Sequence, residues 1–105
     1  MNRKEFFVYL YWPTDRLRFL IDIEDGQVTY FVAQYETLLA DKWTAITRYD
    51  FAHGFFHRDF MNPDGSQEKT PIDIDDRAQA LAFAKNDLQS HWETYLTKYR
   101  NRINP

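Results

Sequence analysis

The sequence predicts an α+β domain in which a meander of about five antiparallel strands is followed by one long C-terminal helix packed on one face of the sheet. Short apolar or alternating runs separated by turn signals fill residues 5–61, and aromatic residues make up 18% of the chain. After about residue 75 the apolar residues recur every three or four positions. A chain of 105 residues has room for one ordinary core, so we expect a single domain over residues 1–105.

The first three strands are predicted from their hydrophobic pattern and from one tight turn. Residues 5–12 are bulky and apolar and end at Pro13, which predicts a strand. Residues 16–25 alternate between apolar and charged side chains, as expected for a strand with one face in solvent. The dipeptide Asp25-Gly26 favours a two-residue hairpin because glycine accepts a positive φ, and a third strand is expected at residues 27–37.

The later strands are separated by weaker signals. Residues 38–42 indicate a looser connection, followed by a fourth strand at residues 43–49 and a fifth at residues 55–61. Residues 62–66, Asn-Pro-Asp-Gly-Ser, are turn chemistry throughout, and residues 69–72 are expected to return as an edge strand.

The helix is expected to run from about residue 75 to residue 100. Its apolar stripe consists of Leu81, Ala84, Leu88, Trp92, Tyr95 and Tyr99. Aspartates cap free backbone N–H groups at helix starts, and Asp73, Asp75 and Asp76 stand where this helix should begin.

Composition excludes several classes of function. The chain has 13 basic and 16 acidic residues, so its overall charge favours neither a nucleic acid nor a membrane surface as partner. It has no cysteine, which excludes disulfides and thiolate chemistry and suits a reducing compartment. The short apolar run near the start lacks a cleavage site and membrane-spanning length, so we expect a cytoplasmic protein with no membrane partner.

Ionisable residues are concentrated in residues 48–59, RYDFAHGFFHRD. On a strand, Arg48 and Asp50 share one face and Tyr49 points to the other. This pair is either a surface ion pair or an anion hook in which Asp50 positions the guanidinium. His57 and Asp59 likewise share a face, opposite to Arg58, and the carboxylate could orient the imidazole for proton transfer.

The bend between the fourth and fifth strands is expected at His53-Gly54, where glycine allows a conformation that other residues avoid. Metal binding competes as an interpretation, since Asp50, His53, His57 and Asp59 supply nitrogen and oxygen donors. The His-x-x-x-His spacing nevertheless spans a glycine bend and is not part of a His-Glu-x-x-His pattern. The sequence therefore predicts no metal and no cofactor.

Residues 43–59 resemble the central motif of the TumE family of small prokaryotic toxin-like proteins, through Arg48-Tyr49-Asp50, then Gly54, then His57-Arg58. Residues 62–65, 68–71 and 80–84 are similar to an uncharacterised family of bacteria and archaea, so that the resemblance covers about residues 30–100. It implies a protein encoded with an antitoxin that carries a helix-turn-helix, with toxicity directed at RNA. The second histidine of the TumE pattern is replaced here by Asp59.

Two main functional hypotheses follow. In the first, the chain is a toxin-like, metal-independent ribonuclease: His57 is the general acid or base, Arg48 and Arg58 meet phosphate charge, and Tyr49 donates a hydrogen bond. The remaining residues assigned to binding are Asp50, His53, Gly54 and Asp59. This hypothesis requires the side chains of His57 and Arg48 to converge on a hollow that solvent reaches.

In the second hypothesis, the chain is a non-catalytic protein–protein interaction module or regulatory subunit. Its aromatic first strand or its helix face binds a partner, or a second copy in a homodimer, and the polar window only shapes the bend. A metal-dependent hydrolase is a third alternative.

Overall fold

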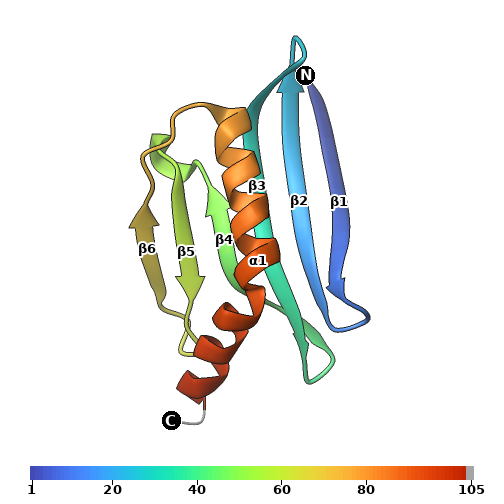
Figure 1. The fold of residues 1–105 in the computed structure, drawn as a ribbon, viewed down its shortest axis with the longest axis vertical. Helices are drawn as coiled ribbons and strands as arrows, with labels where there is room; N and C mark the ends of the chain where they lie inside the picture. Colours follow the sequence, from blue (N-terminus) through green and yellow to red (C-terminus); the bar gives the residue numbers. More distant parts are fainter. Residues whose placement is uncertain (104–105) are drawn as a thin grey trace.

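The computed structural model describes residues 1–103 and confirms an α+β fold, with one antiparallel sheet and one long helix. The strands pair in chain order as a meander (Figure 1). The sheet has six strands because the edge strand expected near residue 70 pairs fully with its neighbour. The elements are β1 (Asn2–Tyr11), β2 (Asp15–Glu24), β3 (Gln27–Leu39), β4 (Lys42–Asp50), the short 3-10 turn η1 (Ala52–Gly54), β5 (His57–Met61), β6 (Gln67–Pro71) and α1 (Arg77–Ile103).

Two of the hairpins each have a two-residue turn whose backbone adopts the left-handed conformation, with positive φ. Asp25 and Gly26 have φ values of 51° and 75°, which confirms the predicted tight turn between β2 and β3. The looser connection predicted at residues 38–42 is wrong, because β3 continues to Leu39 and β4 begins at Lys42. Ala40 and Asp41 make this turn with φ values of 49° and 63°, without the glycine that usually marks such a turn.

The helix begins at Arg77 and continues to Ile103. Asp76 is the aspartate that caps it, since its Oδ1 accepts a hydrogen bond of 2.8 Å from the backbone N–H of Gln79. Ala80 and Ala84 are fully buried, and these small side chains allow the helix to lie close to the sheet.

The helix crosses β3 diagonally and leaves the β1–β2 hairpin to one side (Figure 1). Residues such as Leu17, Phe31 and Tyr35 form the core between the sheet and α1. Alternate residues on the same strands point to the opposite side, which we call the open face. Within residues 1–103, none of the helices combines the length and apolarity that crossing a bilayer requires.

Candidate functional site

The residues singled out from the sequence are divided between the two sides of the sheet. The β4–β5 register places Arg48 opposite Asp59, Tyr49 opposite Arg58 and Asp50 opposite His57. Tyr49 binds α1 through its hydroxyl, so Tyr49 and Arg58 lie on the helix side. The other four side chains alternate with them and belong to the open face. The sequence correctly predicted which residues share a face, but Tyr49 and Arg58 cannot act beside His57.

On the open face, Asp50, His57 and Asp59 form a compact buried cluster, which we call the open-face triad. His57 is 0% exposed. Its Nε2 lies 2.9 Å from Asp50 Oδ1 and 3.2 Å from Asp59 Oδ2. Its Nδ1 lies 3.1 Å from the carbonyl oxygen of Phe55, whose ring centroid is 5.2 Å from that of the imidazole. The imidazole is therefore anchored through Nδ1 and shielded from solvent, while its Nε2 faces two carboxylate oxygens.

Two further groups approach the carboxylates of the triad. The backbone N–H of Ala52, at the start of η1, donates a hydrogen bond of 3.1 Å to Asp50 Oδ1. Lys69 on β6 places its ammonium 3.1 Å from Asp59 Oδ1, and its side chain is 39% exposed. Four elements, β4, η1, β5 and β6, thus meet at the triad, and Lys69 connects it to the surface.

Arg48 takes part in a separate chain of polar contacts across the open face. Its Nε donates to Gln34 Oε1 at 2.8 Å, and Gln34 Nε2 donates to Glu36 Oε2 at 2.6 Å. Glu36 Oε1 accepts a hydrogen bond of 2.9 Å from Arg16 Nε. Of the described residues, Gln34 rather than Asp50 holds Arg48, so the predicted positioning role of Asp50 is wrong.

Sequence reasoning missed Gln34, Glu36 and Arg16, although a signal for them exists. They occupy alternate positions of β2 and β3, on the same face as Arg48. Arg16 is also held by aromatic rings: its guanidinium carbon lies 3.9 Å from the ring centroid of Phe7 and 3.7 Å from that of Trp43. Such stacking fixes a cation in place and makes it less available to an external phosphate.

His53 and Gly54 lie in η1, at the predicted bend. Both are exposed and have positive φ values, 68° for His53 and 85° for Gly54. Glycine suits this conformation, whereas a histidine there is uncommon. The cluster of ligand atoms on the open face includes neither residue, and His53 does not replace the missing second histidine.

On the helix side, Tyr49 and Tyr95 donate hydrogen bonds to the same oxygen, Oδ2 of Asp87, at 2.6 Å and 2.5 Å. Arg58 in turn donates to the Tyr49 hydroxyl at 3.3 Å. Burial, together with the hydrogen bond to Asp87, raises the pKa of Tyr49 well above its usual range and the pKa of Tyr95 to about 12. The Tyr49 hydroxyl fastens β4 to the helix, whereas Tyr95 and Asp87 both belong to α1.

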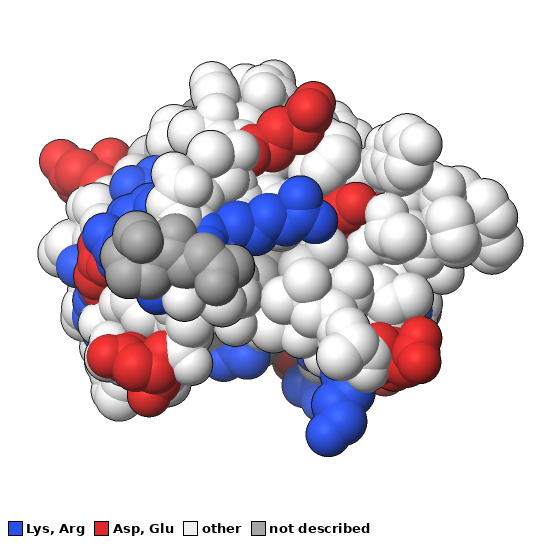
Figure 2. Space-filling view, turned by 90° about the horizontal axis from the view of Figure 1, so that it is seen from below, with Lys and Arg blue, Asp and Glu red and all other residues white. Residues whose placement is uncertain are grey.

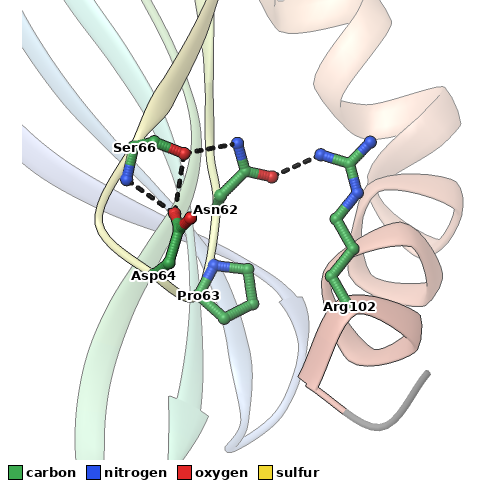
Figure 3. Close-up of a pocket in the computed structure, with 5 residues that line it drawn as sticks. All are labelled: Asn62, Pro63, Asp64, Ser66 and Arg102. Atoms are coloured by element: carbon green, nitrogen blue, oxygen red, sulfur yellow. Dashed lines mark hydrogen bonds between the residues drawn. The ribbon is translucent and has the colours of Figure 1, made fainter.

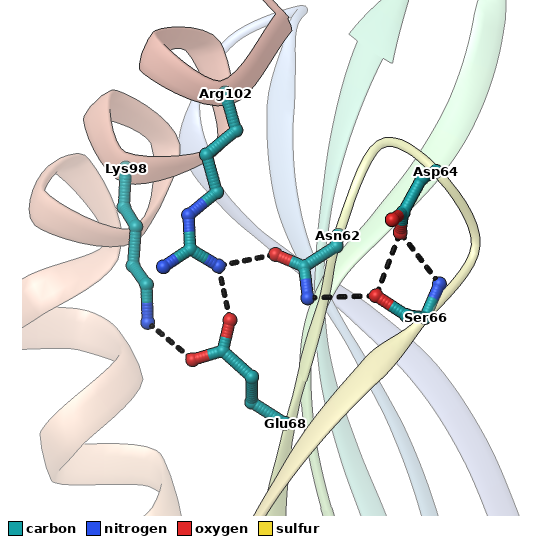
Figure 4. A network of polar contacts seen from close by, with 6 residues as sticks. All are labelled: Asn62, Asp64, Ser66, Glu68, Lys98 and Arg102. Atoms are coloured by element: carbon teal, nitrogen blue, oxygen red, sulfur yellow. Dashed lines mark hydrogen bonds and ion pairs between the residues drawn. The ribbon is translucent and has the colours of Figure 1, made fainter.

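A second polar network fastens the end of α1 to the β5–β6 turn. Arg102 faces an open hollow of about 310 Å³ lined by the turn residues, among them Asn62 (Figure 3). Glu68 accepts hydrogen bonds from Arg102 and Lys98, and Arg102 also donates to Asn62 (Figure 4). Hydrogen bonds that the Glu68 carboxylate accepts from Arg102, then from Asn62 and Lys98, lower the pKa of Glu68 to about 2. The charges in this network satisfy one another, which is typical of a structural contact.

Five of the nine exposed large hydrophobic residues in residues 1–103 are aromatic residues of β1 and the turn after it. Within residues 6–12, the exposed side-chain rings are Phe6 (42%), Phe7 (49%), Tyr9 (40%), Tyr11 (62%) and Trp12 (71%). We call these five residues the β1 patch. Seen from the end of the molecule in Figure 2, acidic and basic residues are interspersed, and the lobe on the side of the β1–β2 hairpin is uncharged.

Comparison with known proteins shows the family of the chain. Searches of curated proteins and of solved structures found no match. The resemblance to the TumE family stays a prediction. A protein-family comparison matches the whole chain, residues 1–105, and the chain therefore belongs to the family described as a domain of unknown function (DUF7718).

Proposed function

We propose that the chain is a protein–protein interaction module that forms a homodimer through β1. The observation that carries this proposal is the β1 patch, which lies on an edge strand. β1 is ten residues long and, within residues 1–103, pairs only with β2, so one row of its backbone N–H and C=O groups has no described strand beside it. Long apolar edge strands of this kind pair readily with another chain.

A second copy is the occupant that the pattern of β1 favours. Antiparallel pairing of β1 with itself, centred on Phe7, places the charged residues 3–5 of one copy beside the uncharged residues 9–11, Tyr-Leu-Tyr, of the other. Parallel pairing in register would place like charges side by side. An antiparallel pair also obeys the two-fold symmetry that most homodimers have.

An apolar cavity beside this edge supports the same proposal. It has a volume of about 130 Å³ and is lined by Phe6, Val8, Phe19, Ile21, Leu81 and Lys85. Its lining comes from β1, β2 and the helix residues Leu81 and Lys85, so the cavity lies between the β1–β2 hairpin and α1. A second copy seated on β1 would bury its apolar lining, and burial of such surface favours association.

Sedimentation equilibrium of the purified protein tests the proposal. We expect the wild-type chain to be a dimer and the double variant Phe7→Glu, Tyr9→Glu to be a folded monomer, because four carboxylates would meet at the interface. Ile103→Lys is the control: it adds a charge at a residue of similar exposure, 45%, on α1. A monomeric wild-type chain, or a double variant that remains dimeric, would refute pairing through β1.

A toxin-like, metal-independent ribonuclease, cytoplasmic and paired with an antitoxin, is the second candidate function. One observation favours it: Arg48 and His57 lie on the same face of adjacent strands. The burial of His57 and the position of Tyr49 and Arg58 on the helix side weigh against it. RNA cleavage with chelator present, by wild-type protein but not by folded His57→Ala, would support this function. No cleavage by either protein, or equal cleavage by both, would exclude it.

A further inference from the structure

We propose that Asp50, His57 and Asp59 bind a divalent transition-metal ion, with Zn²⁺ as the best fit. This inference goes beyond the interaction function and replaces the sequence-based expectation of no metal. One ligand atom from each of the three residues lies within 4.8 Å of the others, and all three residues are buried. Three protein ligands from nitrogen and oxygen donors are typical of zinc sites that keep a further position for water or substrate.

The hydrogen bonding of His57 indicates which nitrogen would bind the metal. Its Nδ1 faces the Phe55 carbonyl at 3.1 Å, and a carbonyl oxygen only accepts hydrogen bonds, so Nδ1 carries the proton. In the neutral ring, Nε2 therefore presents a lone pair. The oxygens that Nε2 faces, from Asp50 and Asp59, also act as acceptors, so an electron-pair acceptor such as a metal ion suits the space between the three atoms.

A proton on Nε2 fits this arrangement less well than a metal ion. Although both oxygens are near, neither lies close enough to the direction of an Nε2–H bond to accept a hydrogen bond, and this buried nitrogen has no other partner in residues 1–103. A proton on Nε2 therefore bonds to neither carboxylate, whereas a metal ion that accepts the Nε2 lone pair can also bind one oxygen of each carboxylate.

The two distances from His57 Nε2 to the carboxylates agree with those between ligands of one metal ion. Atoms bound at ~2.05 Å from zinc lie about 2.9 Å apart at a right angle and about 3.3 Å apart at the tetrahedral angle. The distances from Nε2 to the two carboxylate oxygens are 2.9 Å and 3.2 Å. Hydrogen bonds between protein groups do not require two acceptors to share one nitrogen in this way.

The surroundings of the triad also match a metal site. A metal-bound imidazole commonly donates its second N–H to a carbonyl oxygen, as His57 does to Phe55, which fixes the ring and its tautomer. Asp50 is held by the Ala52 N–H. One imidazole with two carboxylates suits zinc and its neighbours in the first transition series, while magnesium and calcium prefer oxygen ligands alone.

Zinc titration of tag-free, chelator-treated protein tests this proposal. Isothermal calorimetry should show one Zn²⁺ per chain, and the melting temperature should rise with added zinc because the ion binds only the folded state. Asp59→Asn keeps the shape of the side chain and removes its charge, and we expect it to weaken binding by more than about tenfold. His57→Gln should abolish binding.

The other two histidines provide matched controls. His53 and His91 are both exposed, and His91 also lies 3.0 Å from a carboxylate, that of Asp87. His53→Gln and His91→Gln should bind zinc as the wild type does. Wild-type protein that binds no zinc, or a site lost only in these control variants, would overturn the proposal.

Two measurements keep the result interpretable. If His57→Gln does not fold, the absorption spectrum of bound Co²⁺ still reports whether the triad binds the ion. The spectrum should change in Asp59→Asn and stay the same in His53→Gln. An unchanged spectrum in Asp59→Asn refutes the site. Sedimentation equilibrium on the same samples reports dimerisation separately, so failure of the metal site and failure of the β1 interface are distinguishable.

Discussion

Tyr49 of β4 and Asp87 of α1 are joined by a hydrogen bond of 2.6 Å that ties the centre of the sheet to the middle of the helix. Tyr49 is fully buried and its ring stacks on Phe56, with ring centroids 5.4 Å apart. The family resemblance places Tyr49 in a reaction site, whereas this geometry gives it a structural role. The two roles predict different behaviour when the hydroxyl is removed.

We expect Tyr49→Phe to lower the free energy of unfolding by ~1.5–3 kcal/mol, the range for a hydrogen bond to a charged group. The ring and its packing are kept, so the change isolates the hydroxyl. Urea unfolding followed by tryptophan fluorescence measures the difference. Tyr30→Phe is the control, because Tyr30 lies outside the β1 patch and makes no side-chain hydrogen bond among the described residues. A Tyr49→Phe protein as stable as this control would contradict the structural role.

Stability should fall in strongly alkaline solution as buried tyrosines ionise. The pKa of Tyr95 is raised from 10.0 to about 12, chiefly by burial and then by its hydrogen bond to Asp87. Between these two values the folded chain holds a proton that the unfolded chain has released, so stability is lost as pH rises through this window. Urea unfolding across the window should show this slope, and Tyr95→Phe should reduce it. An equal slope in the variant would disprove the contribution of Tyr95.

The Ala40-Asp41 turn should be open to improvement. Both residues adopt left-handed backbone conformations, which cost a residue other than glycine or asparagine about 1 kcal/mol each. The double variant Ala40→Asn, Asp41→Gly provides the residues that this turn type prefers and should raise the free energy of unfolding by roughly 1 kcal/mol. Asp25→Asn, in a turn that already has its glycine, should change stability far less. A destabilised double variant would show that the turn is held by contacts beyond its backbone.

The fold was predictable to the extent that local signals report local structure. The alternation of residues 16–25, the Asp25-Gly26 turn and the apolar stripe near Leu88 each depend on a few neighbouring residues, and each was confirmed. The Ala40-Asp41 turn was missed because it contains no glycine and its first residue, alanine, does not favour positive φ. There the pairing of two long strands determines the backbone.

The sequence predicted which side of the sheet each candidate residue occupies, but it did not predict that His57 is buried. Strand alternation correctly placed Arg48, Asp50, His57 and Asp59 together on one side. The burial of His57 results from groups on other elements, among them the Phe55 ring and β6, whose positions depend on the register of the whole sheet. The partner of Arg48, Gln34, lies 14 positions earlier in the chain, beyond any local pattern.

The pairing of each strand with its neighbour in the chain has a consequence for biosynthesis. Each hairpin can form as soon as its two strands leave the ribosome, because every strand pairs with the strand next to it in the chain. Such local contacts favour fast folding. The helix that covers the apolar side follows all six strands, from Arg77 to Ile103. Until that segment emerges, the nascent sheet exposes Leu17, Phe31 and Tyr35, so translation stalled before residue 77 would leave an aggregation-prone intermediate that chaperones must shield.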